Sequence, residues 1–309
     1  MPPHHPRSRR FRRPDQPSSP LRLTPRDLEI LRLVAEHRFL TSVHLQKWLN
    51  IRRQPLLRRL QRLYHHGYVD RPRAQLDYYH QGGSRPMVYG LARRGAGRLR
   101  RDLNLPFSRM DWSGRAHQVG RLFLEHALLI ADVMTALELA CRENDGIRLH
   151  LLDGLSPADD ASTSSRDYRW QVTLRSRQRL GIAPDRVFAL EFTNDRQGLT
   201  RAYFFLEADR GTMPVTRSNL RQSSFQRKLL AYEATWRQSV HQRRFGMHRF
   251  RVLTVTGSQD RLRHLVEATR QLEHGRGLFL FLDEATMRDS PDILKEPWHS
   301  PSGTELLMP

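Results

Sequence analysis

Three helical patterns lie in close succession near the beginning of the chain, and they constrain its fold more than any other feature. Thr24 precedes Pro25, the usual order of a helix N-cap and a first helical turn, and apolar residues then recur at helical spacing. A second short helix opens at Thr41, and a third runs from Arg53 to His66 before Gly67 ends it. We therefore expect three short helices here.

Two strand patterns and a further helical pattern follow, at residues 68–69, 86–91 and 92–103. Three short helices followed by a hairpin is the order of a winged helix-turn-helix. The words RRLQRLYHHGYVDR and VYGLARRGAGRL resemble those of bacterial winged-helix DNA-binding proteins. We therefore predict a winged-helix DNA-binding domain over residues 21–110, preceded by a disordered basic tail over residues 1–20.

The positive charge of the chain is concentrated in its first third. The formal net charge is +20, and residues 1–110 hold 24 Lys and Arg against 7 Asp and Glu, whereas the remainder holds 28 against 25. GC-rich coding would raise arginine everywhere, so it does not explain this asymmetry. A polyanionic partner does, because basic groups displace counterions from phosphates. The predicted partner is double-stranded DNA.

In a winged helix the third helix enters the major groove. Arginines on that helix and beside the wing are therefore the candidate DNA contacts. They are Arg52, Arg53, Arg58, Arg59, Arg62, Arg73 and Arg85. The alternative is a solvated basic helix face, which is common, but the element order and the charge asymmetry favour DNA binding.

Other features of the sequence bear on its compartment. The longest apolar stretch, residues 127–141, contains Asp132 and Glu138 and cannot span a bilayer. The N-terminus lacks the apolar segment of a signal peptide, and a single cysteine, Cys141, excludes an intramolecular disulfide framework. We expect a cytoplasmic protein with no membrane partner. The sequence does not fix the oligomeric state, and a homodimer is compatible with it.

The rest of the chain alternates between helical and strand patterns. After an expected linker at residues 104–116 come a long helix, several strands, a helix, a strand, a further helix and a last strand. This order resembles the core of PD-(D/E)xK nucleases. The predicted fold class is α+β, with the winged helix-turn-helix followed by an α/β restriction-endonuclease-like core over residues 111–290. Residues 291–309 contain four prolines and no periodicity, so we expect an unstructured C-terminal tail.

Three carboxylates occupy successive strands of this core. Pro184-Asp185 begins one strand, and Glu207 and Asp209 alternate to one face of the next. Clustered carboxylates repel one another, and a hard cation such as Mg²⁺ relieves the repulsion, activates water and stabilises charge at a phosphodiester. We predict Asp185, Glu207 and Asp209 as Mg²⁺ ligands and catalytic groups. The alternative is that Asp185 caps a strand and the other two acids pair with arginines.

One departure from the nuclease pattern concerns a lysine. Such nucleases usually have Lys two residues after their Glu, where this chain has Asp209. Lys228 on the following helix is the candidate replacement, and Tyr232 lies one turn beyond it on the same face. The chain has 49 Arg and only three Lys, so it almost always uses Arg where only a positive charge is needed. A lysine at this position therefore suggests a different chemical role, although the three lysines must lie somewhere in the chain. We predict Lys228 as the fourth catalytic group.

Five sequence segments, taken in their order along the chain, resemble those of the replication-relaxation family of plasmids and integrated mobile elements over roughly residues 21–285. These segments are LTPRDLEILRLVAEHRFLT, RRLQRLYHHGYV, VYGLARRG, APDRVFAL and FFLEADRGT. The resemblance implies a role in replicating or relaxing plasmid-like DNA.

Our leading hypothesis is a DNA-binding protein that nicks duplex DNA in an Mg²⁺-dependent reaction. The main alternative is a non-catalytic replication initiator or transcription regulator with a degenerate nuclease-like core. A tyrosine relaxase, with Tyr203 or Tyr232 as nucleophile, is disfavoured because the chain contains no His-x-His pair for its metal site.

Overall fold

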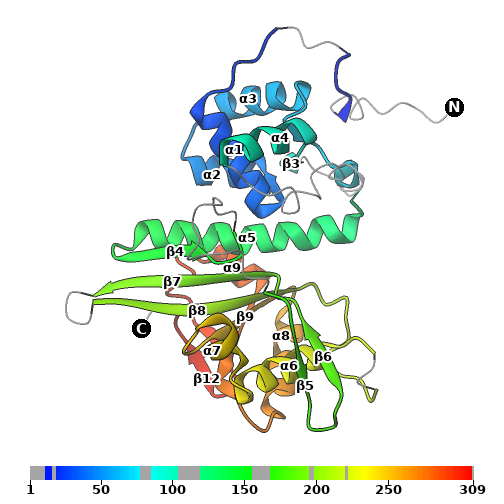
Figure 1. Cartoon of the computed structure of the whole chain (residues 1–309), viewed down its shortest axis with the longest axis vertical. Coiled ribbons are helices and arrows are strands. Elements are labelled where there is room, and N and C mark those ends of the chain that lie inside the picture. The colour runs from blue at the N-terminus through cyan, green and yellow to red at the C-terminus, as the bar shows by residue number, and fades with distance from the viewer. Residues whose placement is uncertain are drawn as a thin grey trace, which may run out of the picture. The chain divides into compact units, whose positions relative to one another are not determined.

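The chain is an α+β protein that divides into two compact units (Figure 1). The computed structural model describes residues 11–15, 19–76, 85–103, 119–154, 168–194, 198–219 and 222–307. The first unit comprises Met1–Thr135 with Gly154–Ser164, and the second comprises Ala136–Asp153 with Ser165–Pro309. No helix within the described ranges is long and apolar enough to cross a membrane.

The helices of the first unit form where the sequence predicts them. In chain order the unit contains α1 (Pro25–His37), β1 (Phe39–Thr41), α2 (Ser42–Leu49), α3 (Arg53–His65), β2 (Val69–Asp70), β3 (Val88–Leu91) and α4 (Arg93–Leu103). The Thr24 side chain and Asp27 form a capping box at the start of α1, and Thr41 caps α2. The strand β1 was not expected, because three residues are too few to display an alternating pattern.

The three strands of the first unit form a small antiparallel sheet in the order β1-β3-β2. Below it the apolar stripes of α1 and α3 meet in one core. Its fully buried members include Ile30, Leu31, Val34, Leu56, Leu60 and Leu63. This core fixes α3 against α1 and leaves the other face of α3 on the surface.

Part of the expected N-terminal tail is packed against this unit. Phe11 is buried, and Arg13 donates from Nε to the Tyr64 carbonyl at 3.0 Å and from Nη2 to the Val69 carbonyl at 3.1 Å. The expectation of a disordered tail is therefore wrong for residues 11–15, because an aromatic ring and a guanidinium both find partners here. Residues 1–10 and 16–18 lie outside the described residues.

The long helix α5 (Arg121–Glu143) begins in the first unit and ends in the second. His44 Nε2 lies 2.6 Å from Asp132 Oδ1, and Trp48 Nε1 donates to Thr135 Oγ1 at 2.9 Å. These bonds attach the first part of α5 to α2, so the division falls within the helix rather than at the expected boundary between residues 110 and 111. The expected linker at 104–116 lies outside the described residues.

The second unit is built on a seven-stranded mixed sheet in the order β12-β11-β10-β9-β8-β7-β4. Its elements are β4 (Ile147–Leu151), β5 (Trp170–Thr173), β6 (Arg179–Ile182), β7 (Arg186–Asn194), β8 (Gly198–Asp209), α6 (Phe225–Arg237), α7 (Val240–Phe245), β9 (Arg251–Thr256), α8 (Gln259–Arg270), a 3₁₀ turn (Arg276–Leu278), β10 (Phe279–Asp283), α9 (Glu284–Asp289), β11 (Trp298–Ser300) and β12 (Gly303–Glu305). The strands β4, β7 and β8 are antiparallel, and β8, β9 and β10 are parallel. The hairpin β5–β6 is a separate sheet.

The expectation of an unstructured C-terminal tail is wrong. The strands β11 and β12 extend the sheet, and Trp298 is fully buried with its Nε1 donating to the Ile293 carbonyl at 3.3 Å. Strands of three residues among prolines leave no periodic pattern, so the sequence concealed them. The helix expected near residues 219–240 is shorter than expected: α6 covers Phe225–Arg237, and a separate helix α7 begins at Val240 after Ser239, which adopts φ 50°.

Candidate functional site

Two of the predicted catalytic carboxylates come from neighbouring antiparallel strands. Asp185 immediately precedes β7, where its backbone N–H donates to the Leu206 carbonyl at 3.0 Å. Its Oδ2 accepts the Ala208 backbone N–H at 2.8 Å. Glu207 lies between these two residues on β8, and its side chain is 2% exposed. The ladder thus brings Asp185 beside a buried Glu207.

Helix α6 supplies two further groups to Glu207. Lys228 Nζ donates a short hydrogen bond to Glu207 Oε2, and the Tyr232 hydroxyl donates to Glu207 Oε1 at 2.6 Å. The two residues are one helical turn apart, so both reach the same carboxylate. Tyr232 is buried in the core, whereas the Lys228 side chain is 35% exposed and Asp185 is half-buried, so solvent reaches the cluster at these two residues.

The pKa directions in this cluster follow from burial and from the charges within it. Burial raises the pKa of Glu207, and Asp185 raises it further, while Lys228 opposes the shift. Burial lowers the pKa of Lys228, but Glu207 and Asp185 outweigh it, so this pKa is raised. Lys228 is therefore a cation at neutral pH, and in this state it cannot accept a proton.

Tyr232 is poorly suited to act as a nucleophile. Burial, together with the Glu207 carboxylate, raises the pKa of Tyr232 well above its ordinary value. Its hydroxyl proton is already donated to Glu207. The structure therefore gives the tyrosine-nucleophile alternative no support at this residue.

Asp209 is held by partners of its own. Arg261 on α8 donates to both of its carboxylate oxygens, from Nε at 2.8 Å and from Nη2 at 3.1 Å, and the Thr256 hydroxyl donates to it at 2.9 Å. Arg261 also donates to the Met213 carbonyl at 2.6 Å. Asp209 thus joins β8 to α8, which is the arginine pairing that the alternative interpretation expected, and its predicted role as a metal ligand is not supported.

Without Asp209 the predicted metal site retains two of its three carboxylates. Within the described ranges no three His, Cys, Asp or Glu side chains are grouped so as to hold a metal ion. Asp185 and Glu207 remain, and Mg²⁺ is bound in proteins by one or two carboxylates together with substrate phosphates. Each carboxylate oxygen has two lone pairs, so the bonds to Lys228 and Tyr232 leave acceptor capacity. These two residues therefore fit a site that is completed by a phosphate.

Thr254 is a member of this site that the sequence did not suggest. It pairs with Glu207 in the β8–β9 ladder and is fully buried. Among the described residues its hydroxyl has no hydrogen-bond partner. Thr254 and Thr256 alternate with apolar residues in the second half of this strand, and this was the available signal. An unpartnered buried hydroxyl beside Glu207 favours a further polar ligand here.

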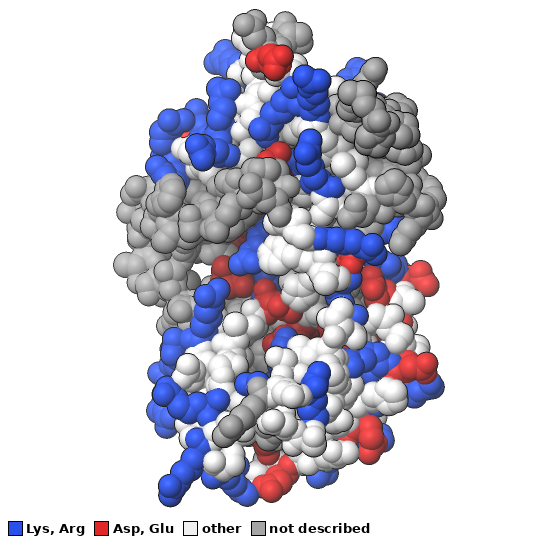
Figure 2. Space-filling model, turned by 90° about the vertical axis from the view of Figure 1, so that its right-hand side faces the viewer, with Lys and Arg blue, Asp and Glu red and all other residues white. Residues whose placement is uncertain are grey.

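The predicted DNA-contacting arginines fall into two groups. Those with exposed side chains are Arg52, Arg53, Arg58, Arg73 and Arg85. By contrast, Arg59 and Arg62 are bonded within the unit, Arg62 through Nη2 to the Pro20 carbonyl at 2.8 Å. The exposed group includes the residues at the start of α3. In Figure 2 basic side chains predominate on the visible face of the first unit, whereas both signs occur on the second.

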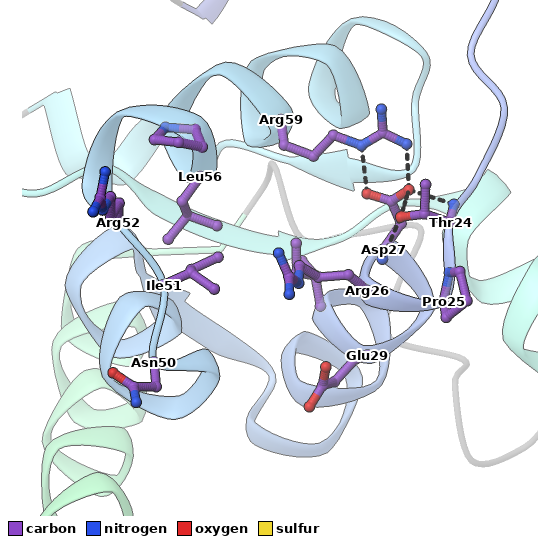
Figure 3. Close-up of a pocket in the computed structure, with 12 residues that line it drawn as sticks. Thr24, Pro25, Arg26, Asp27, Glu29, Asn50, Ile51, Arg52, Leu56 and Arg59 are labelled. Atoms are coloured by element: carbon purple, nitrogen blue, oxygen red, sulfur yellow. Dashed lines mark hydrogen bonds and ion pairs between the residues drawn. The ribbon is translucent and has the colours of Figure 1, made fainter.

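Arg59 holds α3 against the start of α1. Its Nε donates to Asp27 Oδ1 at 2.6 Å, its Nη2 donates a short bond to Asp27 Oδ2, and Asp27 is completely buried (Figure 3). Burial raises the pKa of Asp27, but the bonds from Arg59 and Thr24 outweigh it and hold the pKa below its ordinary value. The interpretation of Arg59 as a DNA contact is therefore not supported.

Replacing Asp27 with Ala is expected to destabilise the first unit by about 3 kcal/mol, because a guanidinium is left without its charge partner in a largely buried position. Thermal unfolding followed by circular dichroism measures this. Since the pKa of Asp27 is lowered on folding, its contribution is present above the unfolded pKa and is lost as pH falls through the folded pKa. Arg58→Ala, at an exposed position of the same helix, is the control and is expected to change stability by less than about 0.5 kcal/mol.

A hollow of about 960 Å³ lies between the first turns of α1 and α3. Ile30, Ile51 and Leu56 contribute apolar lining, and Arg26 and Arg52 contribute exposed positive charge. Figure 3 shows Arg26 directed toward this hollow from α1. Sequence reasoning missed Arg26, because only the fold brings α1 beside the start of α3.

Most of the chain matches one known protein family. The family model described as replication-relaxation matches residues 31–249, which is 219 of the 309 residues. The matched span includes α3 and also Asp185, Glu207 and Lys228, but it ends before Arg261. No curated protein and no solved structure matches the chain significantly.

Proposed function

The chain belongs to the replication-relaxation family, and from this premise we propose that its first unit is a winged helix that binds double-stranded DNA. The family indicates a role in the replication or relaxation of plasmid or mobile-element DNA. The protein would perform this role by holding the duplex on α3.

One observation carries this proposal: α3 presents exposed arginines from a rigid core. Arg52 and Arg53 stand at its first turn and Arg58 lies further along it, while Leu56, Leu60 and Leu63 anchor its other face. A helix fits the major groove of B-DNA, and arginine there reads guanine edges or neutralises phosphates. The excess of 24 basic over 7 acidic residues within residues 1–110 supports the same partner.

The test is the salt dependence of duplex binding by the purified chain, measured by fluorescence anisotropy. Each neutralised phosphate adds about −0.9 to the slope of log K against log salt. We expect a slope of about −4 or steeper, which corresponds to several phosphate contacts. An affinity that stays the same between low and high salt would refute the proposal.

The second candidate function is metal-dependent nicking of the bound DNA, and the convergence of Asp185, Glu207 and Lys228 favours it. The Lys228 ammonium would neutralise a phosphate oxygen at the solvent-facing edge of the cluster. Asp185 and Glu207 would hold Mg²⁺, which when bound supplies a more acidic water and stabilises phosphodiester charge. Tyr232 and the sheet keep Glu207 in one orientation.

Nicking is tested on supercoiled plasmid DNA with Mg²⁺ or Mn²⁺ and, in parallel, with EDTA. Conversion to open circles only with metal supports strand cleavage. If the wild type is inactive with all metals, including on DNA of its own element, the alternative gains support. The protein would then act as a non-catalytic replication initiator or transcription regulator whose nuclease-like core binds without cutting.

A further inference from the structure

Two segments of the second unit contain several arginines and no acid. Residues 168–182, which form the hairpin β5–β6, hold four Arg and no Asp or Glu. Residues 237–251, which run from the end of α6 through α7, hold five Arg and no Asp or Glu. Basic and acidic residues are nearly balanced over residues 111–309, at 28 against 25. The imbalance therefore lies in short segments of the chain, of which these are two.

The fold packs the two segments against each other. The Phe245 ring of α7 lies 5.0 Å from the Tyr168 ring and 5.1 Å from the Trp170 ring, measured between centroids. Gln238, at the end of α6, donates from Nε2 to the Thr173 carbonyl at 2.7 Å. The hairpin and α7 are thus neighbours on one part of the second unit, although more than 50 residues separate them in sequence.

Several arginines of these segments are exposed and remain available for a partner. They are Arg169, Arg177, Arg243 and Arg249, which we call the arginine surface. In the part of the chain that the structure describes, no carboxylate lies within ion-pair distance of these four guanidinium groups. Neighbouring arginines differ, because Arg175 pairs with Glu273 and Arg251 pairs with Glu305. In Figure 2 basic side chains gather along one edge of the second unit.

We propose that the arginine surface is a second contact for the backbone of the DNA bound by this protein. The inference rests on the proposed function and adds a binding surface to it. Exposed guanidinium groups without acid partners suit phosphate, which they bind through two parallel hydrogen bonds. Several such groups on two packed segments suit the closely spaced charges of a nucleic acid better than a single anion.

The position of the surface connects it to the carboxylate cluster. Helix α6 carries Lys228 in its first turn and leads into α7 at its other end. Ten residues separate Lys228 from Gln238, a rise of about 15 Å along a helix. That distance corresponds to about four base-pair steps of duplex DNA. A duplex that is held on the arginine surface and runs along α6 would therefore reach Lys228 within this span.

The experiment uses the full chain and duplex anisotropy across a range of NaCl concentrations. Two variants address the two segments separately: Arg243→Glu with Arg249→Glu, and Arg169→Glu with Arg177→Glu. Each is expected to weaken binding about tenfold at about 100 mM salt and to reduce the salt slope by about 2. The matched control is Arg263→Glu with Arg270→Glu, which makes the same charge change at exposed arginines of α8 that pair within their own helix.

The outcomes separate this inference from the proposed function. If both variants and the control bind like the wild type, while charge reversal on α3 abolishes binding, the arginine surface is not a DNA contact and the first unit still binds DNA. An equal loss in the control also overturns the inference, because net charge alone then explains it. If DNA binding is unchanged but binding to polyglutamate is lost, the surface serves an acidic polypeptide instead. A wild type that binds no duplex refutes both proposals.

Discussion

Replacing Arg53 and Arg58 together with Glu is expected to weaken duplex binding by about 100-fold or more. Both side chains are exposed on α3: Arg58 lies on the side opposite its buried leucines, and Arg53 lies in its first turn. A bidentate arginine contact to a base contributes about 1–3 kcal/mol, and reversal adds repulsion from the phosphates. Equilibrium anisotropy with a labelled duplex measures the loss, and circular dichroism verifies that the variant is folded.

The control for this prediction reverses the same number of charges elsewhere on the first unit. Arg32 on α1 and Arg101 on α4 are exposed, and Arg32→Glu with Arg101→Glu gives the same net charge. We expect the affinity of this variant to fall by less than about tenfold, because only long-range attraction is reduced. If the two variants lose affinity equally, α3 is not the recognition helix.

Arg59 shows which properties of α3 can be predicted from its sequence and which cannot. Helical spacing identifies which residues of α3 are buried and which are outward, and Leu56, Leu60 and Leu63 are buried as that spacing predicts. Spacing alone gave Arg58 and Arg59 equal roles. Asp27 is 32 residues earlier in the chain, and only the packing of α1 on α3 brings its carboxylate to Arg59. A long-range ion pair of this kind leaves no periodic signal.

The carboxylate cluster shows the same division between local and long-range information. Strand alternation places Glu207 and Asp209 on one face of β8, and the start of β7 places Asp185 beside Glu207. Alternation does not distinguish the two acids by their partners. Lys228 and Tyr232 reach Glu207 from α6, whereas Arg261 and Thr256 reach Asp209 from elements that are about 50 residues further along.

The ends of the chain were the least predictable part of the fold. Phe11 and Trp298 are each buried, yet neither lies in a segment with a visible pattern. Short strands such as β11 gain their stability from an existing sheet edge rather than from their own sequence. The sequence contains no information about that edge until the rest of the sheet is known.

Lys228→Arg is expected to reduce metal-dependent nicking by about 100-fold or more while leaving duplex affinity within about twofold. The arginine keeps the charge, but its planar fork cannot occupy the position of the ammonium against Glu207, so the charge at the scissile phosphate is misplaced. Asp185→Asn and Glu207→Gln are expected to have comparable effects. Plasmid nicking and duplex anisotropy are measured on the same preparations. Lys295→Arg makes the identical change at an exposed lysine that pairs with Asp292, and it is the control.

The pH dependence of nicking tests the state of Lys228 independently. Because the neighbouring carboxylates raise its pKa, Lys228 stays protonated across the neutral and mildly alkaline range. The rate is therefore expected not to fall between about pH 7 and pH 9 through loss of this charge, since both values lie below the ordinary lysine pKa. If the wild-type rate does fall between these pH values, and the rate of Lys228→Arg does not, then Lys228 loses its proton in this range. If Lys228→Arg nicks as fast as the wild type, Lys228 only neutralises Glu207, and the phosphate must be bound by other groups.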